Sequence, residues 1–133
     1  MHLAEQFASL IDDKLYLEAG EMISETCEYH HQGAVHQGRT GIIAMYREYD
    51  AEMRRNFDEV TYTSGITIED STTCVVHFFD ILQKGGKVHE SRSEQRLQFD
   101  NGLIVRIEQR DVPGEAEALR AFWQTVNNEL ATH

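Results

Sequence analysis

The stretch TTCVVHFFDILQ, which runs from Thr72 to Gln83, carries apolar side chains on both faces of an extended chain. Its valines and phenylalanines are typical of a strand. A strand that is apolar on both faces belongs to a sheet whose two faces are both covered. The sequence around this stretch therefore has to supply neighbouring strands and the elements that cover them.

Three more strand-like segments lie around this stretch, and short turns separate them. Asp70-Ser71 turns the chain before Thr72, and both Gly85-Gly86 and Asp100-Asn101-Gly102 are typical of tight hairpin turns. The pattern predicts a meander of four antiparallel strands, which consists of the quoted stretch together with Val60–Glu69, Val88–Phe99 and Leu103–Asp111.

The rest of the chain has the hydrophobic period of helices, apart from one short strand and a loop. Asp12-Asp13 interrupts the first apolar stripe and caps a second helix that ends near Ser24. Pro113 suits the first turn of the last helix. The predicted segments outside the meander are helices at 3–11 and 13–24, a strand at 26–31, a loop at 33–38, a long helix at 40–57 and a helix from 113 onward.

Helices and strands are largely segregated along the chain, which is the pattern of the α+β class. The helices are expected to cover one face of the sheet. A broad exposed apolar sheet face is rare in a monomer, so a second subunit is expected to cover the other face. The sequence therefore predicts a homodimer formed through the outer sheet face.

Length and charge narrow the class of protein. The chain has 133 residues, so we expect a single domain over residues 1–133 that needs neither metal nor disulfide to fold. The formal net charge of −11 argues against nucleic acid and against an anionic membrane surface as partners. No apolar run has the length of a membrane span.

The cysteines and the first residues bear on location. Cys27 and Cys74 lie in apolar strand-like segments, where we expect buried reduced thiols instead of a disulfide. The start of the sequence, MHLAEQ, lacks the basic region and the apolar region of a signal peptide. Both observations predict a cytoplasmic location.

Four short segments follow one another in a familiar order and spacing: Phe7–Asp13, Glu28–His31, Gly38–Ile42 and Phe99–Ile104. Together they resemble the nuclear transport factor 2-like superfamily, whose members include ketosteroid isomerase, the SnoaL-type polyketide cyclases and scytalone dehydratase. The resemblance covers nearly the whole chain. It implies a curved antiparallel sheet wrapped around the N-terminal helices, a cystatin-like cone with an internal pocket.

The implied cone also suggests which side chains face its interior, given the alternation along each predicted strand. His31 would lie at the end of its strand and Asp111 near the end of the last one. A slip of one residue would turn every strand side chain to the other face. The expected lining is Tyr29, Met45, Tyr49, Phe78, Gln95, Leu97, Ile107 and Gln109.

The resemblance does not extend to the chemistry of ketosteroid isomerase, which uses an Asp base together with a Tyr and a protonated Asp. By position, the base falls on His31, the tyrosine on Phe7 and the protonated acid near Gln95. Phenylalanine has no hydrogen-bond donor and glutamine has no tunable proton. Steroid isomerisation is therefore rejected as the specific function.

His31 remains the best single candidate for chemistry, because an imidazole titrates near neutrality and suits a general base or acid. A carboxylate would orient the ring, and Asp111 or Asp80 would serve if either lies close. The alternative is a strand-end histidine that is hydrogen-bonded to the following loop. Both interpretations stay open, with His31 and Asp111 as the candidate catalytic residues.

Two amides on the inner face of apolar strands, Gln95 and Gln109, are costly to bury unless they bond to each other, to water or to a ligand. We favour a ligand or pocket water. The spacing of His30, His31 and His36 does not match a zinc site, so neither a metal nor a cofactor is expected.

Three functions fit these observations. The first is a cofactor-independent acid–base enzyme, of isomerase, dehydratase, cyclase or hydrolase type, that acts on a small and largely apolar substrate. The second is a non-catalytic module that binds a small apolar ligand in the same pocket. The third is an interaction protein that works through the outer sheet face.

Overall fold

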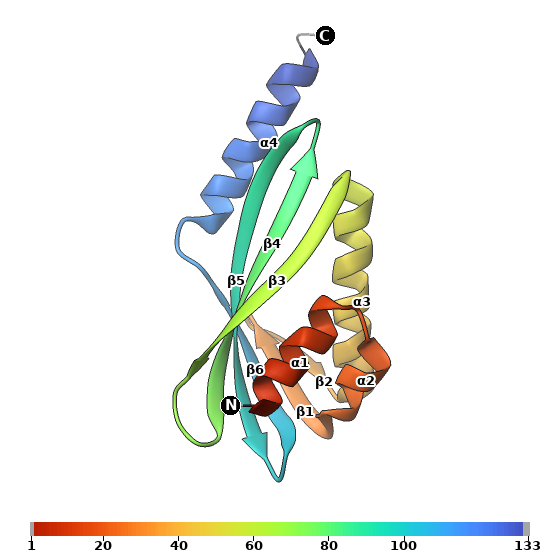
Figure 1. Ribbon diagram of the computed structural model, residues 1–133, viewed down its shortest axis with the longest axis vertical. Helices are drawn as coiled ribbons and strands as arrows, with labels where there is room; N and C mark the ends of the chain where they lie inside the picture. The colour runs from red at the N-terminus through yellow and green to blue at the C-terminus, as the bar shows by residue number, and fades with distance from the viewer. Residues whose placement is uncertain (1, 132–133) are drawn as a thin grey trace.

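The structure, a computed structural model, describes the backbone of residues 2–131 and the side chains of residues 3–128 (Figure 1). Four helices and six strands make up the described chain. In order they are α1 (His2–Asp12), α2 (Tyr16–Glu21), β1 (Ile23–His31), β2 (Ala34–Gln37), α3 (Arg39–Asn56), β3 (Glu59–Ile68), β4 (Thr73–Lys84), β5 (Lys87–Asp100), β6 (Leu103–Asp111) and α4 (Glu115–Ala131). The α+β class predicted from the sequence is confirmed.

All six strands form one curved sheet in the order β2-β1-β6-β5-β4-β3. The four-stranded meander β3 to β6 is antiparallel, as predicted. The sheet as a whole is mixed, however, because β1 runs parallel to β6, with Tyr29 opposite Ile107. The prediction of an entirely antiparallel sheet is wrong at this pair. The long connection through α3 and the meander leaves the direction of β1 free, whereas a hairpin would have fixed it.

The segment predicted as a loop at 33–38 instead contains the strand β2, which forms a hairpin with β1. Gln32 and Gly33 have φ values of 50° and 81° and form a tight turn, so that His31 pairs with Ala34. Positive φ at two central residues is the geometry of a hairpin turn. All four residues of β2 are exposed, and a strand without a buried face leaves no hydrophobic alternation for the sequence to show.

The second helix is shorter than predicted because the sheet begins earlier. Ile23, which falls within the helix predicted at 13–24, is instead the first residue of β1 and is fully buried there. The backbone N–H of Ile104 donates to the carbonyl of Met22 at 2.8 Å. Pairing with β6 therefore ends the helix at Glu21.

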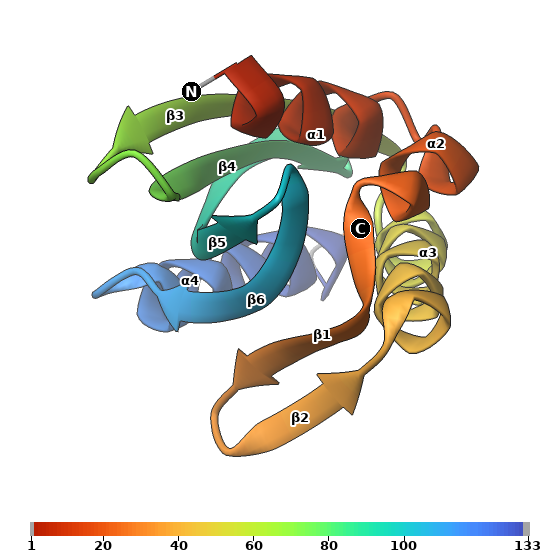
Figure 2. The same ribbon diagram turned by 90° about the horizontal axis from the view of Figure 1, so that it is seen from below.

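The sheet bends around an interior that the helices help to fill (Figure 2). In that view α1 runs beside β3, and α3 lies beside β1. Phe7 of α1 and Ile42 of α3 are fully buried, and the ring of Phe7 packs edge-on against Tyr46 at 6.2 Å between centroids. Amphipathic helices thus bury their apolar stripes against the concave face of the sheet.

The pairing register arranges the inner face in rows. Leu97 of β5 lies opposite Cys74 of β4 and Ile107 of β6, and Tyr29 of β1 continues the same row. Leu97, Cys74 and Ile107 are each fully buried. This row is the packed apolar core at the narrow end of the cone.

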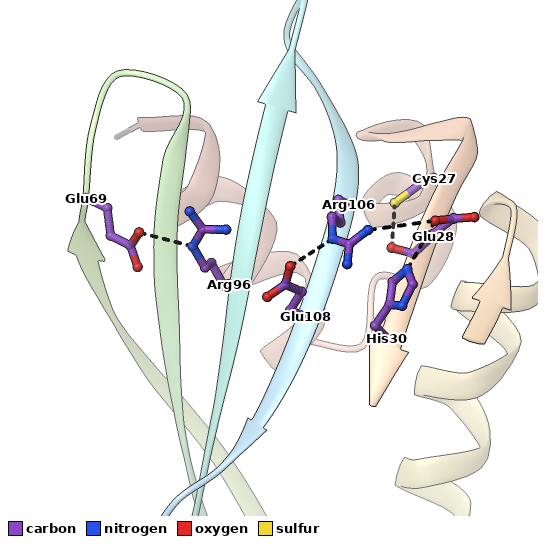
Figure 3. Close-up of polar contacts among 7 residues, drawn as sticks. All are labelled: Cys27, Glu28, His30, Glu69, Arg96, Arg106 and Glu108. Atoms are coloured by element: carbon purple, nitrogen blue, oxygen red, sulfur yellow. Dashed lines mark hydrogen bonds and ion pairs between the residues drawn. The ribbon is translucent and has the colours of Figure 1, made fainter. Parts of the chain in front are cut away.

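The outer face of the sheet is charged toward β1 and β6 (Figure 3). Arg106 donates to Glu108 at 2.8 Å and lies 3.9 Å from Glu28. Arg96 reaches Glu69 at 3.1 Å. These arginines lie on the outer face, and the contact of Arg106 with Glu28 joins the neighbouring strands β6 and β1.

Two further expectations concern the cysteines and membrane spans. Cys27 and Cys74 are both free and buried, so the prediction of buried thiols is confirmed. No helix within residues 2–131 is long and apolar enough to cross a membrane.

We predict that Leu97→Ala destabilises the protein by about 2–5 kcal/mol, because it leaves a cavity in the packed row. Urea denaturation would measure the free energy of unfolding. Ile68→Ala is the matched control, since Ile68 is 58% exposed and its truncation should change that free energy by less than about 0.5 kcal/mol. Equal effects of the two variants would show that Leu97 does not lie in a packed core.

Candidate functional site

A cavity of about 920 Å³ opens on the inner face of the sheet, between α1, α3, α4 and strands β1 to β6. A volume of this order accommodates a drug-sized molecule. Its walls combine apolar side chains such as Met45 and Phe78 with a small number of carboxyls, hydroxyls and amides. This composition is typical of sites that hold a largely apolar molecule in one orientation.

The floor of the cavity is a buried cluster of two tyrosines and two glutamines. The Tyr46 hydroxyl donates to Gln95 Oε1 at 2.5 Å, and Gln95 Nε2 donates to Gln109 Oε1 at 3.0 Å. The Tyr29 hydroxyl also donates to Gln109 Oε1. Burial raises the pKa of both tyrosines, so both remain neutral hydrogen-bond donors.

This cluster decides between the alternatives that the sequence left open for the amides. Gln95 and Gln109 bond to each other and to tyrosines, whereas a ligand or pocket water was the favoured alternative. Gln95 is only 4% exposed, and its bonds meet the cost of burying an amide without a ligand. The cluster therefore makes a rigid, neutral floor.

At one side of the cavity an imidazole meets a carboxylate. His31 Nε2, at the end of β1, lies 3.0 Å from Asp111 Oδ1, at the end of β6. Gln32 donates to the other oxygen of Asp111 at 2.6 Å. These hydrogen bonds, that from His31 first, hold the pKa of Asp111 below its ordinary value. The His31 side chain is one-third exposed, so the pair lies at the rim of the cavity.

On another wall, β4 carries a carboxyl that sequence reasoning considered only as a partner for His31. Asp80 is 5% exposed, and its partner is Tyr49 of α3, whose hydroxyl donates to Asp80 Oδ2 at 2.7 Å. Burial raises the pKa of Asp80 to about 6, and the charges of Asp12 and Glu115 act in the same direction. The hydrogen bond from Tyr49 opposes this rise.

Two more carboxyls line the same wall. Asp12 of α1 accepts a hydrogen bond from Ser64 at 2.6 Å, and its other oxygen, Oδ1, is buried without a hydrogen-bond partner. Asp50 of α3 accepts from the Tyr62 hydroxyl at 2.7 Å and pairs with Arg54 at 3.1 Å. Burial raises the pKa of Asp12 as well. The wall formed by α1, α3, β3 and β4 is thus acidic.

The end of the cavity farthest from the core is bounded by the last helix. Leu119 and Trp123 of α4 line the cavity, and the Trp123 ring lies 5.1 Å from the ring of Phe57 between centroids. His89 of β5 lies 2.8 Å from Glu115 at the start of α4. Aromatic packing and one polar contact therefore hold α4 against the sheet.

The structure brings most of the predicted site residues to this cavity and leaves two outside it. Leu97 and Ile107 are not part of the lining, because they lie one row deeper, in the packed core. Those that line it are Tyr29, His31, Met45, Tyr49, Phe78, Gln95, Gln109 and Asp111. Lining residues that sequence reasoning did not place there include Asp12, Tyr46, Asp50, Tyr62, Asp80 and Trp123.

The sequence contains a signal for one of these lining residues, Asp80. Asp80 is the only charged residue in Thr72–Gln83, and it shares the strand face of Val76, Phe78 and Leu82. A single carboxylate on the inner face of an apolar strand is costly unless it has a partner or a function.

No group of three or more His, Cys, Asp or Glu side chains in the described part of the chain is placed to hold a metal ion.

Comparison with known proteins bears on the fold. No family model matches the sequence, and no curated protein matches it. A protein from Xanthomonas campestris pathovar campestris that is assigned as a polyketide cyclase superposes with a TM-score of 0.66 at 11% identity, over 88% of this chain and 94% of the other. A protein from Kribbella flavida assigned as a ketosteroid isomerase gives 0.65 at 17% identity, over 81% and 73%.

The protein TerC, crystallised with polyporic acid, has a TM-score of 0.66 at 14% identity and covers 95% of this chain and 96% of its own. A protein from Cytophaga hutchinsonii that is described as NTF2-like superposes with a TM-score of 0.64 at 15% identity, over 81% of this chain and 95% of the other. The chain has the nuclear transport factor 2-like fold. The fold predicted from the resemblance is therefore confirmed, and its sheet is corrected by the parallel β1–β6 pair and by the additional strand β2. Similarity at these identities concerns the fold and does not identify the reaction.

The buried carboxyl of Asp80 makes a testable contribution to the stability of the protein. Because the pKa of Asp80 is raised from 3.8 to about 6, the folded protein holds a proton that the unfolded chain releases between those pH values. Stability then falls as pH rises through this range, and the penalty is complete above about pH 6. We predict that Asp80→Asn stabilises the protein at pH 8 by an amount on the order of 2 kcal/mol, with little difference near pH 4.

Urea denaturation at the two pH values would measure this difference. Glu59→Gln removes a charge from an exposed position and should change stability little at either pH. A variant at position 80 that is equally destabilised at pH 4 and pH 8 would contradict the burial of an ionisable carboxyl.

Proposed function

We propose that this protein is a cofactor-independent acid–base enzyme that acts on a small, largely apolar molecule, with His31 as the general base. The observation that carries the proposal is the His31–Asp111 pair, 3.0 Å apart at the rim of the cavity. A histidine that is held by a carboxylate and placed at a cavity is the usual arrangement for proton transfer near neutral pH.

The contact with Asp111 sets the tautomer of the ring. Asp111 is a carboxylate that accepts a hydrogen bond, so Nε2 of His31 carries the proton that it donates. The lone pair then lies on Nδ1, which becomes the basic atom. Asp111 also stabilises the imidazolium that forms when Nδ1 takes a proton, and Gln32 holds Asp111 in place.

The remaining walls support the binding of an apolar molecule. The side chains of the floor, Tyr29, Tyr46, Gln95 and Gln109, form hydrogen bonds with one another. They therefore present polar but uncharged groups to a bound molecule. Met45, Phe78 and Trp123 supply apolar contact area. Proteins assigned as a ketosteroid isomerase and as a polyketide cyclase share this fold, so the fold is compatible with the proposed chemistry.

A simple chromogenic compound tests the base. In 5-nitrobenzisoxazole, a base takes the C3 proton, the electron pair of that C–H bond forms a nitrile, and the N–O bond breaks to release a coloured phenolate. We predict that His31→Ala lowers kcat/KM for this compound by at least about 100-fold. Absorbance of the phenolate measures the rate.

His30→Ala is the matched control, because His30 lies next in sequence but contacts Glu28 on the outer face of the sheet. Its rate should stay within about threefold of the natural protein. If His31→Ala has no more effect than His30→Ala, His31 is not the base. Thermal stabilisation by apolar compounds without any turnover would favour the second candidate function, a ligand-binding module.

We also propose that the protein is a homodimer through the outer sheet face. Arg96, Arg106 and Arg110 lie on this face among Glu94 and Glu108, which leaves it near neutral in a chain whose net charge is −11. Two copies repel one another least there, and alternating charges match across a two-fold axis. Phe79 and Ile81 of β4 supply half-buried apolar area on the same face.

A charge at the centre of this face should separate the subunits. We predict that Phe79→Asp converts a dimer to a monomer in sedimentation velocity, because it buries an unpaired charge at the interface. Leu17→Asp, at a residue of α2 that is 77% exposed, should leave the mass unchanged. A natural protein that sediments as a monomer at micromolar concentration would contradict the proposal. The cytoplasmic location stays a prediction.

A further inference from the structure

We propose that Asp80 is the general acid of this site and that Tyr49 is its positioning residue. The inference rests on the proposed acid–base function and adds a second catalytic residue to it. Asp80 delivers a proton to the leaving atom of the substrate, while His31 takes a proton from carbon. The two residues lie on different walls, since β5 and β6 separate β4 from β1 in the sheet.

The first support is the position of Asp80 in the rows of the inner face. Phe78 lies opposite Ser93, which lies opposite Asp111, so the row that contains the rim carboxylate crosses β4 at Phe78. Asp80 is two residues further along β4, in the next row, opposite Ser91 and Tyr62. His31 and Asp80 both line this cavity, so a molecule bound there lies between the wall that carries the base and the wall that carries the acid.

The second support is that Asp80 forms no ion pair with a cation among those given for the described residues. None of the ion pairs given by the described residues includes Asp80, although Asp80 is 95% buried. A permanently charged carboxylate in that position would be uncompensated, and such a group is strongly unfavourable. The neutral acid is the form that this environment favours, and a neutral acid is a proton donor.

Two charged groups that face Asp80 raise its pKa, and one hydrogen bond lowers it. Asp12 of α1 and Glu115 of α4 raise its pKa by their charge, and burial raises it further, to about 6. Nearby Asp50 is paired with Arg54, and Glu115 contacts His89. Arg92 lines the same cavity. Tyr62 donates to Asp50, so Tyr49 is the phenol that lowers the pKa of Asp80.

Tyr49 also decides which oxygen carries the proton. Its hydroxyl donates to Oδ2 at 2.7 Å, so the acidic proton of Asp80 lies on Oδ1. Burial and the nearby Asp80 raise the pKa of Tyr49, which keeps the phenol protonated and fixes this direction. Tyr49 thus orients the acid without exchanging its own proton.

A base and an acid on separate walls define a class of reaction. His31 takes a proton from a carbon, the electron pair of that C–H bond forms a new double bond, and the bond to a leaving oxygen breaks as Asp80 protonates that oxygen. The product of a hydroxyl leaving group is water. Solvent then removes the proton from His31 and returns one to Asp80, so no oxidant or reductant takes part. The substrate class is a small β-hydroxy carbonyl compound or a similar molecule with an acidic C–H next to a leaving hydroxyl.

Two benzisoxazoles that differ in their leaving group test the role of Asp80. The phenolate released from 5-nitrobenzisoxazole is stable without a proton, whereas the one released from unsubstituted benzisoxazole is more basic and gains from a general acid. We expect Asp80→Asn to lower kcat/KM for benzisoxazole at pH 6 by at least about tenfold and for the nitro compound by less than about threefold. Asn keeps the size of the side chain and an oxygen for Tyr49.

The pH profile separates an acid from a structural residue. With benzisoxazole, the rate of the natural protein relative to Asp80→Asn should step down as pH rises through about 6, because Asp80 loses its proton there while the base is common to both proteins. Tyr49→Phe should move the step to higher pH, since it removes the bond that lowers the pKa of Asp80. Glu59→Gln should change neither the rates nor the profile.

The failures of the two proposals differ. If Asp80→Asn lowers both rates equally, or leaves both unchanged, Asp80 is not a general acid, whatever the result for His31. If His31→Ala leaves both rates unchanged while Asp80→Asn acts on benzisoxazole alone, His31 is not the base and Asp80 remains the acid. A natural protein that accelerates neither compound above buffer overturns both proposals.

Discussion

The register of strands β4, β5, β6 and β1 sorts the inner face of the sheet into rows, and the rest of the structure depends on it. Cys74, Leu97, Ile107 and Tyr29 lie in one row, in which the first three are packed core and the Tyr29 hydroxyl reaches the floor of the cavity. The next row carries amides and the rows beyond it carry carboxyls. Because side chains alternate along each strand, every second residue moves one row further from the core. The rows that line the cavity are therefore more polar than the core row, with amides and carboxyls placed among apolar residues such as Phe78 and Leu82.

This arrangement of rows brings two titratable groups into different surroundings. The His31–Asp111 pair lies at the partly exposed rim, where each member compensates the other. Asp80 lies against apolar neighbours and a phenol, where a charge is unfavourable. Environments that push two ionisable groups in different directions are the usual origin of a base and an acid in one site. The stability that the protein loses by burying Asp80 is consistent with a residue kept for function.

The sequence predicted the elements of the meander because its turns and its alternation are both strong. Alternation was also enough to place Gln95 and Gln109 on one face. It could not predict the parallel direction of β1, since a long connection allows either direction, nor β2, whose four residues are all exposed. Leu97 was assigned to the pocket because alternation identifies the face and gives no depth along the strand. The role of Asp80 depends on which residues of α1, α3 and α4 pack around it, and that is decided only by the tertiary fold.

The central claim is that the carboxyl of Asp80 on β4 is buried beside the cavity and holds its proton up to about pH 6, well above the ordinary range of an aspartate. Carbon-13 NMR of the aspartate carboxyl groups, followed from pH 3 to pH 8, measures this directly. The account predicts one aspartate resonance that titrates near pH 6 and is absent from the spectrum of Asp80→Asn. An Asp80 resonance that titrates near the ordinary value for aspartate, about 4, would contradict it.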